Sequence, residues 1–441
     1  MIVMKFGGSS VKDSERMKEV ANIVRLELAK KPVVVLSACK GITDKLIETA
    51  NKANEGEDYS ILADEITKLH YNIIKDFNLG NSLVDPILDE FFDLINKIKE
   101  NNELNAEILD HVQSFGEMLS TRIFAAYFSS IGVSSRQFDA WRIGMITDSE
   151  FGGAEPLESA PKKIADALKK VKEVPIVTGF IGKDINGVIT TLGRGGSDYT
   201  AAIIGAAINA DEIQIWTDAD GIMTADPRVV KNAKTNEKVS FAEASELAFF
   251  GAKVLHPKTI LPAMNKNIPV RVLNTYNPKG KGTIIVKEAN KSRDVIKAIA
   301  CKKNITLVNI NSTRMIDAHG FLAKVFDVFG DYGKSVDMIA TSEVNVSLTV
   351  DDDKNLDKII DELRGIADIN VEKNKAIVCV VGEGMKHTPG IAGKTFTALG
   401  KNEVNIEMIS QGASEINISF IVNNQEADKA VQVLHKEYFG S

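Results

Sequence analysis

Ile2-Val-Met-Lys-Phe-Gly-Gly-Ser-Ser10 and Pro32-Val-Val-Val-Leu-Ser-Ala-Cys-Lys-Gly41 are the two stretches of this sequence that decide its fold class. Each begins with a short apolar run that is typical of a buried parallel strand and ends in a loop of small and polar residues. Between them, residues 14–29 place apolar side chains at helical spacing. Strand, loop, helix, strand is the unit of an α/β sheet, so a mainly parallel sheet is predicted.

The pattern continues to about residue 290. Residues 59–130 are helical in pattern. Further strands are expected at Pro175–Phe180, Val188–Thr191 and Glu212–Thr217, with a helix at Tyr199–Asn209 between the last two. These elements predict one α/β domain over residues 1–290.

The last third contains an internal repeat with a period of about 70 residues. Among the paired positions, Gly320, Phe326 and Met338 recur as Gly390, Phe396 and Met408. Each copy reads strand, helix, strand, strand, helix, which is the core of a ferredoxin-like unit.

Only the first copy has a closing strand, near Ile369–Glu372. A spare strand at Val295–Cys301 precedes the first copy and is expected to complete the second. We therefore predict that the first repeat, residues 305–374, is inserted within the second, residues 295–304 and 375–441.

Composition argues against several classes of partner. The net charge of −7 gives no electrostatic case for nucleic acid or an anionic membrane. No run approaches 18 apolar residues, and the start of the chain is too short an apolar stretch for a secretory signal. The three cysteines are far apart, and the six histidines show no zinc-site spacing. A cytoplasmic protein without its own metal site is expected.

Two glycine-containing loops are candidates for substrate chemistry. Lys5–Ser10 follows a strand, so its glycine N–H groups can approach phosphate oxygens beside the Lys5 charge, although it is no Walker A motif and a plain tight turn is the alternative. In Thr191–Thr200, Arg194 can bind a carboxylate bidentately and Asp198 can accept an ammonium, as an α-amino acid requires. A helix cap within a glycine turn is the competing interpretation.

Two later segments also contain polar candidates. Trp216–Arg228 follows a strand end, where α/β sheets bind ligands, but Asp218, Asp220 and Asp226 can equally be turn formers. Phe250–Pro257 places a lysine in an apolar stretch, where it can reach a phosphate or extend to solvent.

Together these segments resemble the aspartate kinases of the amino acid kinase family. Six of them occur in that family's order: Lys5–Ser10, Ser37–Thr43, Phe115–Ser120, Leu192–Thr200, Trp216–Arg228 and Phe250–Pro257. The paired repeats resemble ACT domains. The resemblance implies a three-layer sandwich with a mainly parallel sheet, two βαββαβ domains, and a monofunctional enzyme that forms 4-phospho-L-aspartate from L-aspartate and ATP with Mg²⁺. This is the first step of lysine, threonine and methionine biosynthesis.

The resemblance also implies roles for individual residues. Those expected to be catalytic are Lys5, Gly8 and Asp198. Those expected to hold aspartate are Ser37, Thr43, Glu117, Arg194 and Asp198. Those expected to bind ATP are Lys5, Gly7, Gly8, Thr217, Asp218, Met223, Arg228 and Lys253. Many relatives have Tyr where this chain has Met223, which weakens the case for aromatic stacking on adenine.

The first repeat resembles that of lysine-inhibited aspartate kinases. Asp337 is expected to bind an effector ammonium, in a pocket lined by Met315, Phe321, Leu322, Ser335 and Val336. The apolar members can equally be core positions. ACT units typically pair between subunits, so a homodimer or a dimer of dimers is implied.

Three alternatives stay open. Threonine, alone or with lysine, is the second effector candidate. The acceptor can be another amino acid or carbamate. A non-catalytic amino-acid sensor is the third, although Lys5, Arg194, Asp198 and Lys253 argue against an inactive kinase.

Overall fold

The computed structural model describes residues 1–251, 257–288, 295–312, 319–411 and 416–440. The chain forms two compact units. The first comprises Met1–Ile222, Glu237–Phe241 and Val254–Ala289, and the second comprises Met223–Asn236, Ala242–Lys253 and Asn290–Ser441. Two segments that precede residue 290 therefore group with the second unit. The reason is packing, because Ala225 and Val230 are buried in the same hydrophobic core as Val378 and Phe420.

The first unit is built on an eight-stranded sheet that is parallel except for one pair. In spatial order its strands are β3 (Ser135–Phe138), β4 (Val174–Thr178), β2 (Pro32–Leu36), β1 (Ile2–Phe6), β7 (Glu212–Thr217), β9 (Val270–Asn274), β10 (Thr283–Val286) and β8 (Lys238–Ser240). Only β9 and β10 pair antiparallel. The predicted strand near 188–191 is β6 (Ile189–Thr191), which pairs with β5 (Ile181–Lys183) in a separate hairpin.

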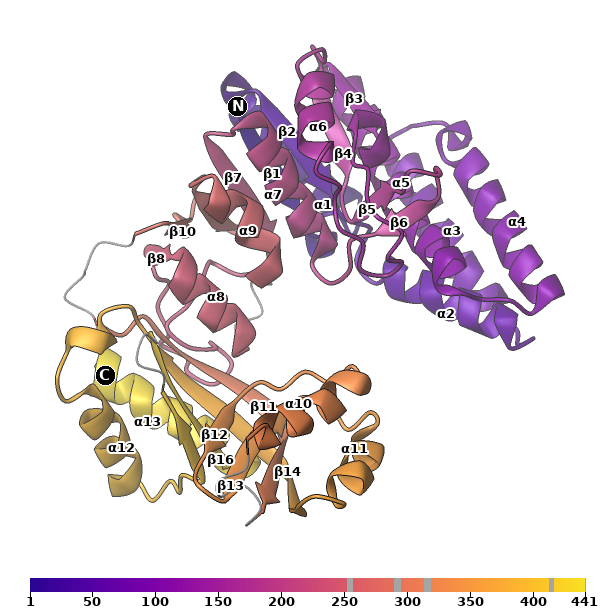
Figure 1. Ribbon diagram of the computed structural model, residues 1–441. Helices are drawn as coiled ribbons and strands as arrows, with labels where there is room; N and C mark the ends of the chain where they lie inside the picture. The colour runs from indigo at the N-terminus through magenta and orange to yellow at the C-terminus, as the bar shows by residue number, and fades with distance from the viewer. Residues whose placement is uncertain (252–256, 289–294, 313–318, 412–415, 441) are drawn as a thin grey trace. The chain divides into compact units, whose positions relative to one another are not determined.

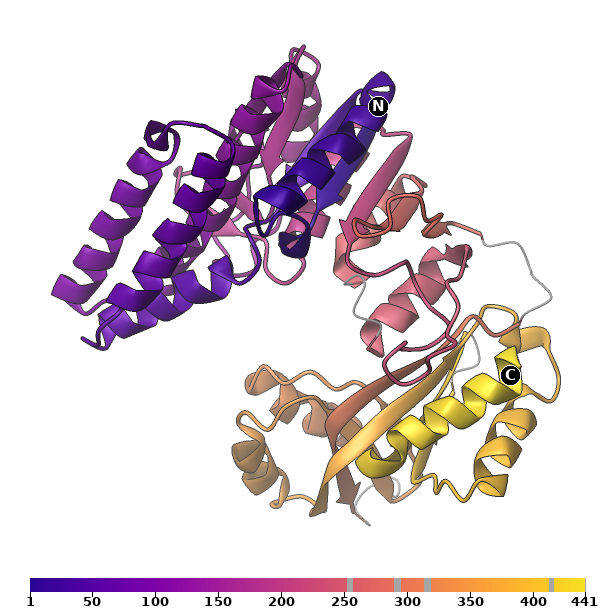
Figure 2. The same cartoon turned by 180° about the vertical axis from the view of Figure 1, so that it is seen from behind.

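Helices pack on both faces of this sheet. They are α1 (Ser14–Leu26), α2 (Ile42–Asn54), α3 (Ser60–Asp76), α4 (Asp85–Asn101), α5 (Ala106–Ser130), α6 (Ala160–Leu168), α7 (Gly196–Ile208) and α9 (Pro257–Asn265). The dark indigo helix α1 crosses the sheet in Figure 2, and α7 and α9 lie together in Figure 1.

Strand β1 shows how alternation creates the layers. Ile2, Met4 and Phe6 lie in the core formed with α1 to α5. Val3 and Lys5 point to the other face, where α7 packs against β1. The resulting helix–sheet–helix arrangement confirms the predicted fold class.

The second unit contains a six-stranded antiparallel sheet. Its strands, in spatial order, are β12 (Ile339–Thr341), β13 (Asn345–Val350), β11 (Ala298–Asn311), β14 (Asp368–Val381), β16 (Asn417–Asn423) and β15 (Met408–Ser410). Its helices are α8 (Phe241–Phe249), α10 (Phe321–Asp331), α11 (Leu356–Leu363), α12 (Ile391–Lys401) and α13 (Ala427–Phe439).

The central strands β11 and β14 are longer than the sequence predicted. The spare strand and the first strand of the first repeat are one continuous strand, β11, and the closing strand of that repeat continues into the second copy as β14. Figure 1 shows both as long arrows through the unit. Among the described residues, none of the helices combines the length and hydrophobicity needed to cross a bilayer.

Candidate active site

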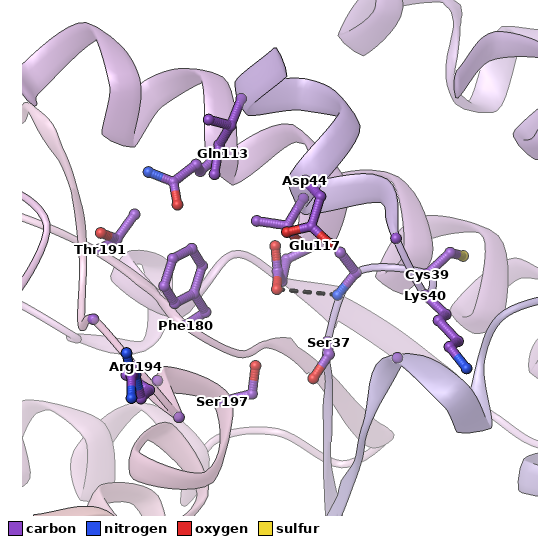
Figure 3. A pocket seen from close by; sticks show the side chains of 18 of the residues that line it. Ser37, Cys39, Lys40, Asp44, Gln113, Glu117, Phe180, Thr191, Arg194 and Ser197 are labelled. Atoms are coloured by element: carbon purple, nitrogen blue, oxygen red, sulfur yellow. Dashed lines mark hydrogen bonds between the residues drawn. The ribbon is translucent and has the colours of Figure 1, made fainter. Parts of the chain in front are cut away.

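A cavity of about 820 Å³ lies at the carboxyl ends of β1, β2 and β4 in the first unit (Figure 3). Loops that follow parallel strands meet at this edge, so segments far apart in sequence line one space. The lining residues are Lys5, Gly8, Ser37, Ala38, Cys39, Lys40, Gly41, Thr43, Asp44, Ile47, Gln113, Glu117, Gly152, Phe180, Thr191, Gly193, Arg194, Gly195, Gly196 and Ser197. The cavity thus brings together the expected aspartate-binding residues Ser37, Thr43, Glu117 and Arg194.

Lys5 and Asp198 form an ion pair at the edge of this cavity. The Lys5 Nζ lies 2.6 Å from Asp198 Oδ1, and both side chains are largely buried. Lys5 comes from β1 and Asp198 from the first turn of α7. The ion pair therefore holds the ammonium group of Lys5 against the first turn of α7.

The start of α7 carries the glycine-rich loop. Its N-cap is Gly195, with φ of 71°, and no side chain in the described chain caps the helix there. Neither Ser197 nor Asp198 caps this helix, so the competing interpretation of the segment as a helix cap is not what the structure shows. The helix N-terminus faces the cavity, where its N–H groups favour an anion.

Arg194 lines the cavity (Figure 3), and the residue is exposed. Its guanidinium forms no hydrogen bond or ion pair with any residue that the structure describes. An unpaired guanidinium presents several N–H donors in one plane, which matches the geometry of a carboxylate.

Glu117 is the most perturbed acid in the cavity. It comes from α5, is 3% exposed, and its Oε1 accepts a hydrogen bond of 3.0 Å from the Ala38 N–H. Oε2 is buried and has no hydrogen-bond donor within the described ranges. Burial raises the pKa of Glu117 to about 8, although the Ala38 N–H and the Lys5 charge act in the opposite direction.

The two glycines of the first loop differ in what their N–H groups do. The Gly7 N–H donates to the Trp216 carbonyl at 3.2 Å, so this donor already has a backbone partner. Gly8 lines the cavity, and a Cβ there would lie 2.8 Å from the Ala38 carbonyl oxygen. Close approach of two backbone segments explains the glycine at position 8.

Sequence reasoning missed Asp110, which binds the end of β6 and the loop at Gly152. Its oxygens accept hydrogen bonds from the Thr191 N–H and Oγ1, both at 2.7 Å, and from the Gly152 N–H at 3.0 Å. Asp110, Gln113 and Glu117 lie on one face of α5, at the spacing i, i+3, i+7. A polar row in a mostly apolar helix is the signal that could have found Asp110 and Gln113.

Comparison with known proteins agrees with this geometry. Residues 1–274 match the amino acid kinase family, and residues 308–357 and 378–438 match the ACT domain. The chain is 45% identical to chloroplastic aspartokinase 1 of Arabidopsis thaliana, covering 100% of this chain and 80% of the relative. It is 37% identical to lysine-sensitive aspartokinase 3 of Escherichia coli K12, covering 100% and 99%.

The chain belongs to the aspartokinases. Its predicted family and its activity as an aspartate kinase with ACT domains are therefore confirmed. Among solved structures, E. coli aspartokinase III in complex with aspartate and ADP aligns with a TM-score of 0.86 at 35% identity, covering 100% of both chains. The same enzyme in complex with lysine and aspartate aligns with a TM-score of 0.82 at 35% identity, covering 100% of this chain and 99% of that one.

The expected nucleotide residues of this aspartokinase are distributed over both units. Thr217 ends β7, and its Oγ1 donates to Asp218 Oδ1 at 3.3 Å. Met223 and Arg228 belong to the second unit, where Arg228 pairs with Asp226 at 2.6 Å in an exposed position. The first unit alone therefore contains Lys5, Thr217 and Asp218 but neither Met223 nor Arg228. Lys253 lies outside the described residues.

The expected effector residues of the aspartokinase lie around the start of α10 and the segment before β12. Phe321 is buried, Leu322 is exposed, and Ser335 and Val336 precede Asp337. Met315 lies outside the described residues.

Asp337 already has an ammonium partner within the chain. Its side chain is 4% exposed, and Oδ2 lies 3.0 Å from the Lys302 Nζ. Lys302 also contacts Asp351 at 2.5 Å. Burial, followed by the hydrogen bond with Asp351, raises the pKa of Asp337 to about 7. An effector ammonium at Asp337 would therefore compete with Lys302.

Proposed function

We propose that this aspartokinase transfers the γ-phosphoryl group of ATP directly to the side-chain carboxylate of L-aspartate. A carboxylate oxygen forms the new bond to phosphorus, the bond to the bridging oxygen of ADP breaks, and 4-phospho-L-aspartate results. Because the acceptor is already ionised at neutral pH, no base is needed. The protein must position two anions and screen their repulsion.

The observation that carries this proposal is the polarity of the 820 Å³ cavity. It holds an unpaired guanidinium at Arg194 and a buried oxygen of Glu117 without a donor among the described residues. These are the complements of an α-carboxylate and an α-ammonium. Ser37 and Thr43 line the space near them and are assigned to the same substrate.

The phosphate end is assigned to Lys5, Gly8 and the start of α7. Lys5 supplies a fixed positive charge, and its ion pair with Asp198 sets the direction of that charge. Gly8 lines the cavity, whereas the Gly7 N–H is already paired with the Trp216 carbonyl. Thr217, Asp218, Met223, Arg228 and Lys253 are assigned to the rest of the nucleotide.

Mg²⁺ is assigned to the nucleotide phosphates. Magnesium in phosphoryl-transfer sites keeps several waters and binds through phosphates with one or two carboxylates. The largely buried Asp198 carboxylate beside Lys5 suits such a neighbourhood. When bound, the ion neutralises charge that develops on the transferring group.

Inhibition by lysine through the ACT domains is the proposed regulation. It is supported by the lysine-sensitive E. coli relative and by its solved complex with lysine and aspartate. Asp337, with Phe321, Leu322, Ser335 and Val336, is the proposed pocket, and threonine is the alternative effector. We further assign residues 305–374 to an inserted ACT domain, 295–304 and 375–441 to the second, and a dimeric or tetrameric assembly to their pairing.

The direct test measures aspartate-dependent release of ADP from Mg-ATP, with hydroxylamine trapping of the acyl phosphate. Adding lysine or threonine in parallel reactions tests regulation separately. Release of ADP that depends on aspartate supports the transfer, and its loss with lysine supports the effector. Folded protein that releases no ADP with aspartate would overturn the proposed reaction, and activity indifferent to lysine would overturn only the effector.

A further inference from the structure

A second cavity lies in the first unit, on the other side of α5 from the catalytic cavity. It has a volume of about 360 Å³, within the range of small-molecule sites. Its walls come from α4, α5, the segment at residues 139–142 and the β5–β6 hairpin. The lining residues are Leu83, Pro86, Ile87, Glu90, Met118, Arg122, Asp139, Trp141, Arg142, Lys183 and Ile189.

One pair of charges in this cavity is neutralised internally. Arg122 donates to both oxygens of Asp139, from Nη1 at 3.1 Å and from Nη2 at 3.2 Å. Asp139 is 2% exposed and also accepts from the Gln137 amide at 2.8 Å. This buried network forms a rigid wall, and within it Asp139 neutralises Arg122.

One cation without an ion pair among the described residues, Lys183, lies beside that wall, together with an exposed arginine. The Lys183 Nζ lies 4.8 Å from the centre of the Trp141 ring and forms no ion pair in the part of the chain that the structure describes. The Arg142 side chain is 70% exposed and forms an ion pair with Asp139, with its Nε 3.4 Å from Oδ2. The aromatic face holds the Lys183 ammonium in place without neutralising it.

The rest of the cavity is apolar, apart from one acid at the rim. Ile87, Met118 and Ile189 are nearly fully buried side chains that line it. At the rim, Glu90 contacts the His111 Nε2 at 3.2 Å. Burial lowers the pKa of His111, so at neutral pH this imidazole does not cancel the Glu90 charge.

We propose that this cavity is a binding site for a small organic carboxylate with an apolar body. The carboxylate binds the Lys183 ammonium beside Arg142, and the hydrocarbon part packs on Ile87, Met118 and Ile189. Amino acids with hydrocarbon side chains and the corresponding 2-oxo acids share this chemistry. Glu90 distinguishes them, because only the amino acid offers an ammonium.

Occupancy of this site should alter the catalytic cavity, because the two share walls. Met118 follows Glu117 on α5, and Ile189 lies two residues before Thr191 on β6. A ligand that tightens Met118 and Ile189 therefore acts on the helix and strand that hold the candidate aspartate site. The expected kinetic effect is a change in the KM for aspartate. Binding at this second cavity is independent of the proposed inhibition by lysine.

Tryptophan fluorescence offers a direct test with the full-length chain. The chain has two tryptophans, and Trp216 is 5% exposed and stacked on Phe6, away from this cavity. Titration with L-leucine, L-phenylalanine or 4-methyl-2-oxopentanoate to about 10 mM, which covers weak sites, should give a saturable change. Trp141→Phe should lose the optical signal while calorimetry still detects the heat of binding.

Substitutions of single residues test which side chain binds the carboxylate of the ligand. Lys183→Met keeps the stem over the indole and should weaken binding about tenfold or more, because a charge-assisted hydrogen bond is lost. Lys172→Met, at an exposed lysine outside the cavity, should bind as the wild type does. Glu90→Gln should weaken only the amino acids.

Three results would overturn the proposal. The first is the absence of any saturable signal or heat with folded wild-type protein. The second is unchanged affinity in Lys183→Met. The third is loss of binding in Asp337→Ala with retention in Lys183→Met, which would assign the ligand to the regulatory unit. Calorimetry on the wild type decides the first result even if a variant misfolds.

Discussion

The KM for aspartate should fall as the pH rises from about 6 to about 8, because Glu117 must be ionised to hold the substrate ammonium. Burial raises the pKa of this carboxyl to about 8, and its Oε2 has no donor among the described residues. At neutral pH the empty site is therefore mostly protonated. At one pH unit below the pKa, removing the proton from Glu117 weakens the binding of aspartate about tenfold, or ~1.4 kcal/mol. At two units below the pKa, it weakens that binding about a hundredfold.

The assay is aspartate saturation at saturating Mg-ATP over this pH range. In the wild type, KM should fall roughly tenfold from about pH 6 to 7 and about fivefold more to about pH 8. Glu117→Gln has the same shape but cannot ionise, so its KM should be higher and nearly flat with pH. Calorimetry in buffers of different ionisation enthalpy should detect a proton released as aspartate binds. An identical pH slope in the wild type and the Gln variant would refute the reasoning.

Three further substitutions test other parts of the molecule. Lys5→Met should lower kcat about 10²–10³-fold, because a preorganised charge at the transferring group is lost; steady-state kinetics with circular dichroism checks this, and near-normal turnover would contradict it. Asp110→Asn should raise the KM for aspartate about tenfold or more and leave that for ATP unchanged, because Thr191 loses its anionic acceptor; equal changes in both KM values would indicate general damage. Asp337→Asn should remove inhibition by lysine, measured as the ratio of rates with and without lysine, and undiminished inhibition would exclude this carboxylate.

The main outline of the candidate site was predicted from sequence motifs and the family resemblance, and the order of the strands explains why those motifs meet. Lys5 is the next-to-last residue of β1 and Ser37 follows β2, and these parallel strands are neighbours in the sheet. Polar residues directly after such strands necessarily lie at one edge. The role of Ser37 was predicted from the family resemblance, and the cavity contains both Lys5 and Ser37.

Other features depend on contacts that a single sequence does not reveal. The Gly7 N–H is paired by the carbonyl of Trp216, a residue distant in sequence. Asp110 acts on Thr191 and Gly152 through hydrogen bonds that only the folded chain creates. Lys302 reaches Asp337 in the same way. In each case the partner is set by tertiary packing, whereas sequence patterns report local periodicity.

The long strands of the regulatory unit show why the sequence suggested four separate strands. In β11 and β14, Asn304 and Asn374 adopt left-handed conformations with φ of 61° and 58°, where an extra residue interrupts alternation. Alternation therefore breaks in the sequence, although the strand continues. The pairing has the same register before and after this point because each strand contains one extra residue.

These two asparagines also explain how the repeats share one sheet. They occupy equivalent positions of the repeat, and so do β11 and β14 as wholes. The first half of β11 pairs with the second half of β14 beside β16, and its second half pairs with β13. Half of the first strand of each copy, β11 or β14, therefore pairs within the sheet of the other copy. Neither copy can complete its sheet alone, so an effector that shifts a long strand in one copy necessarily acts on the other.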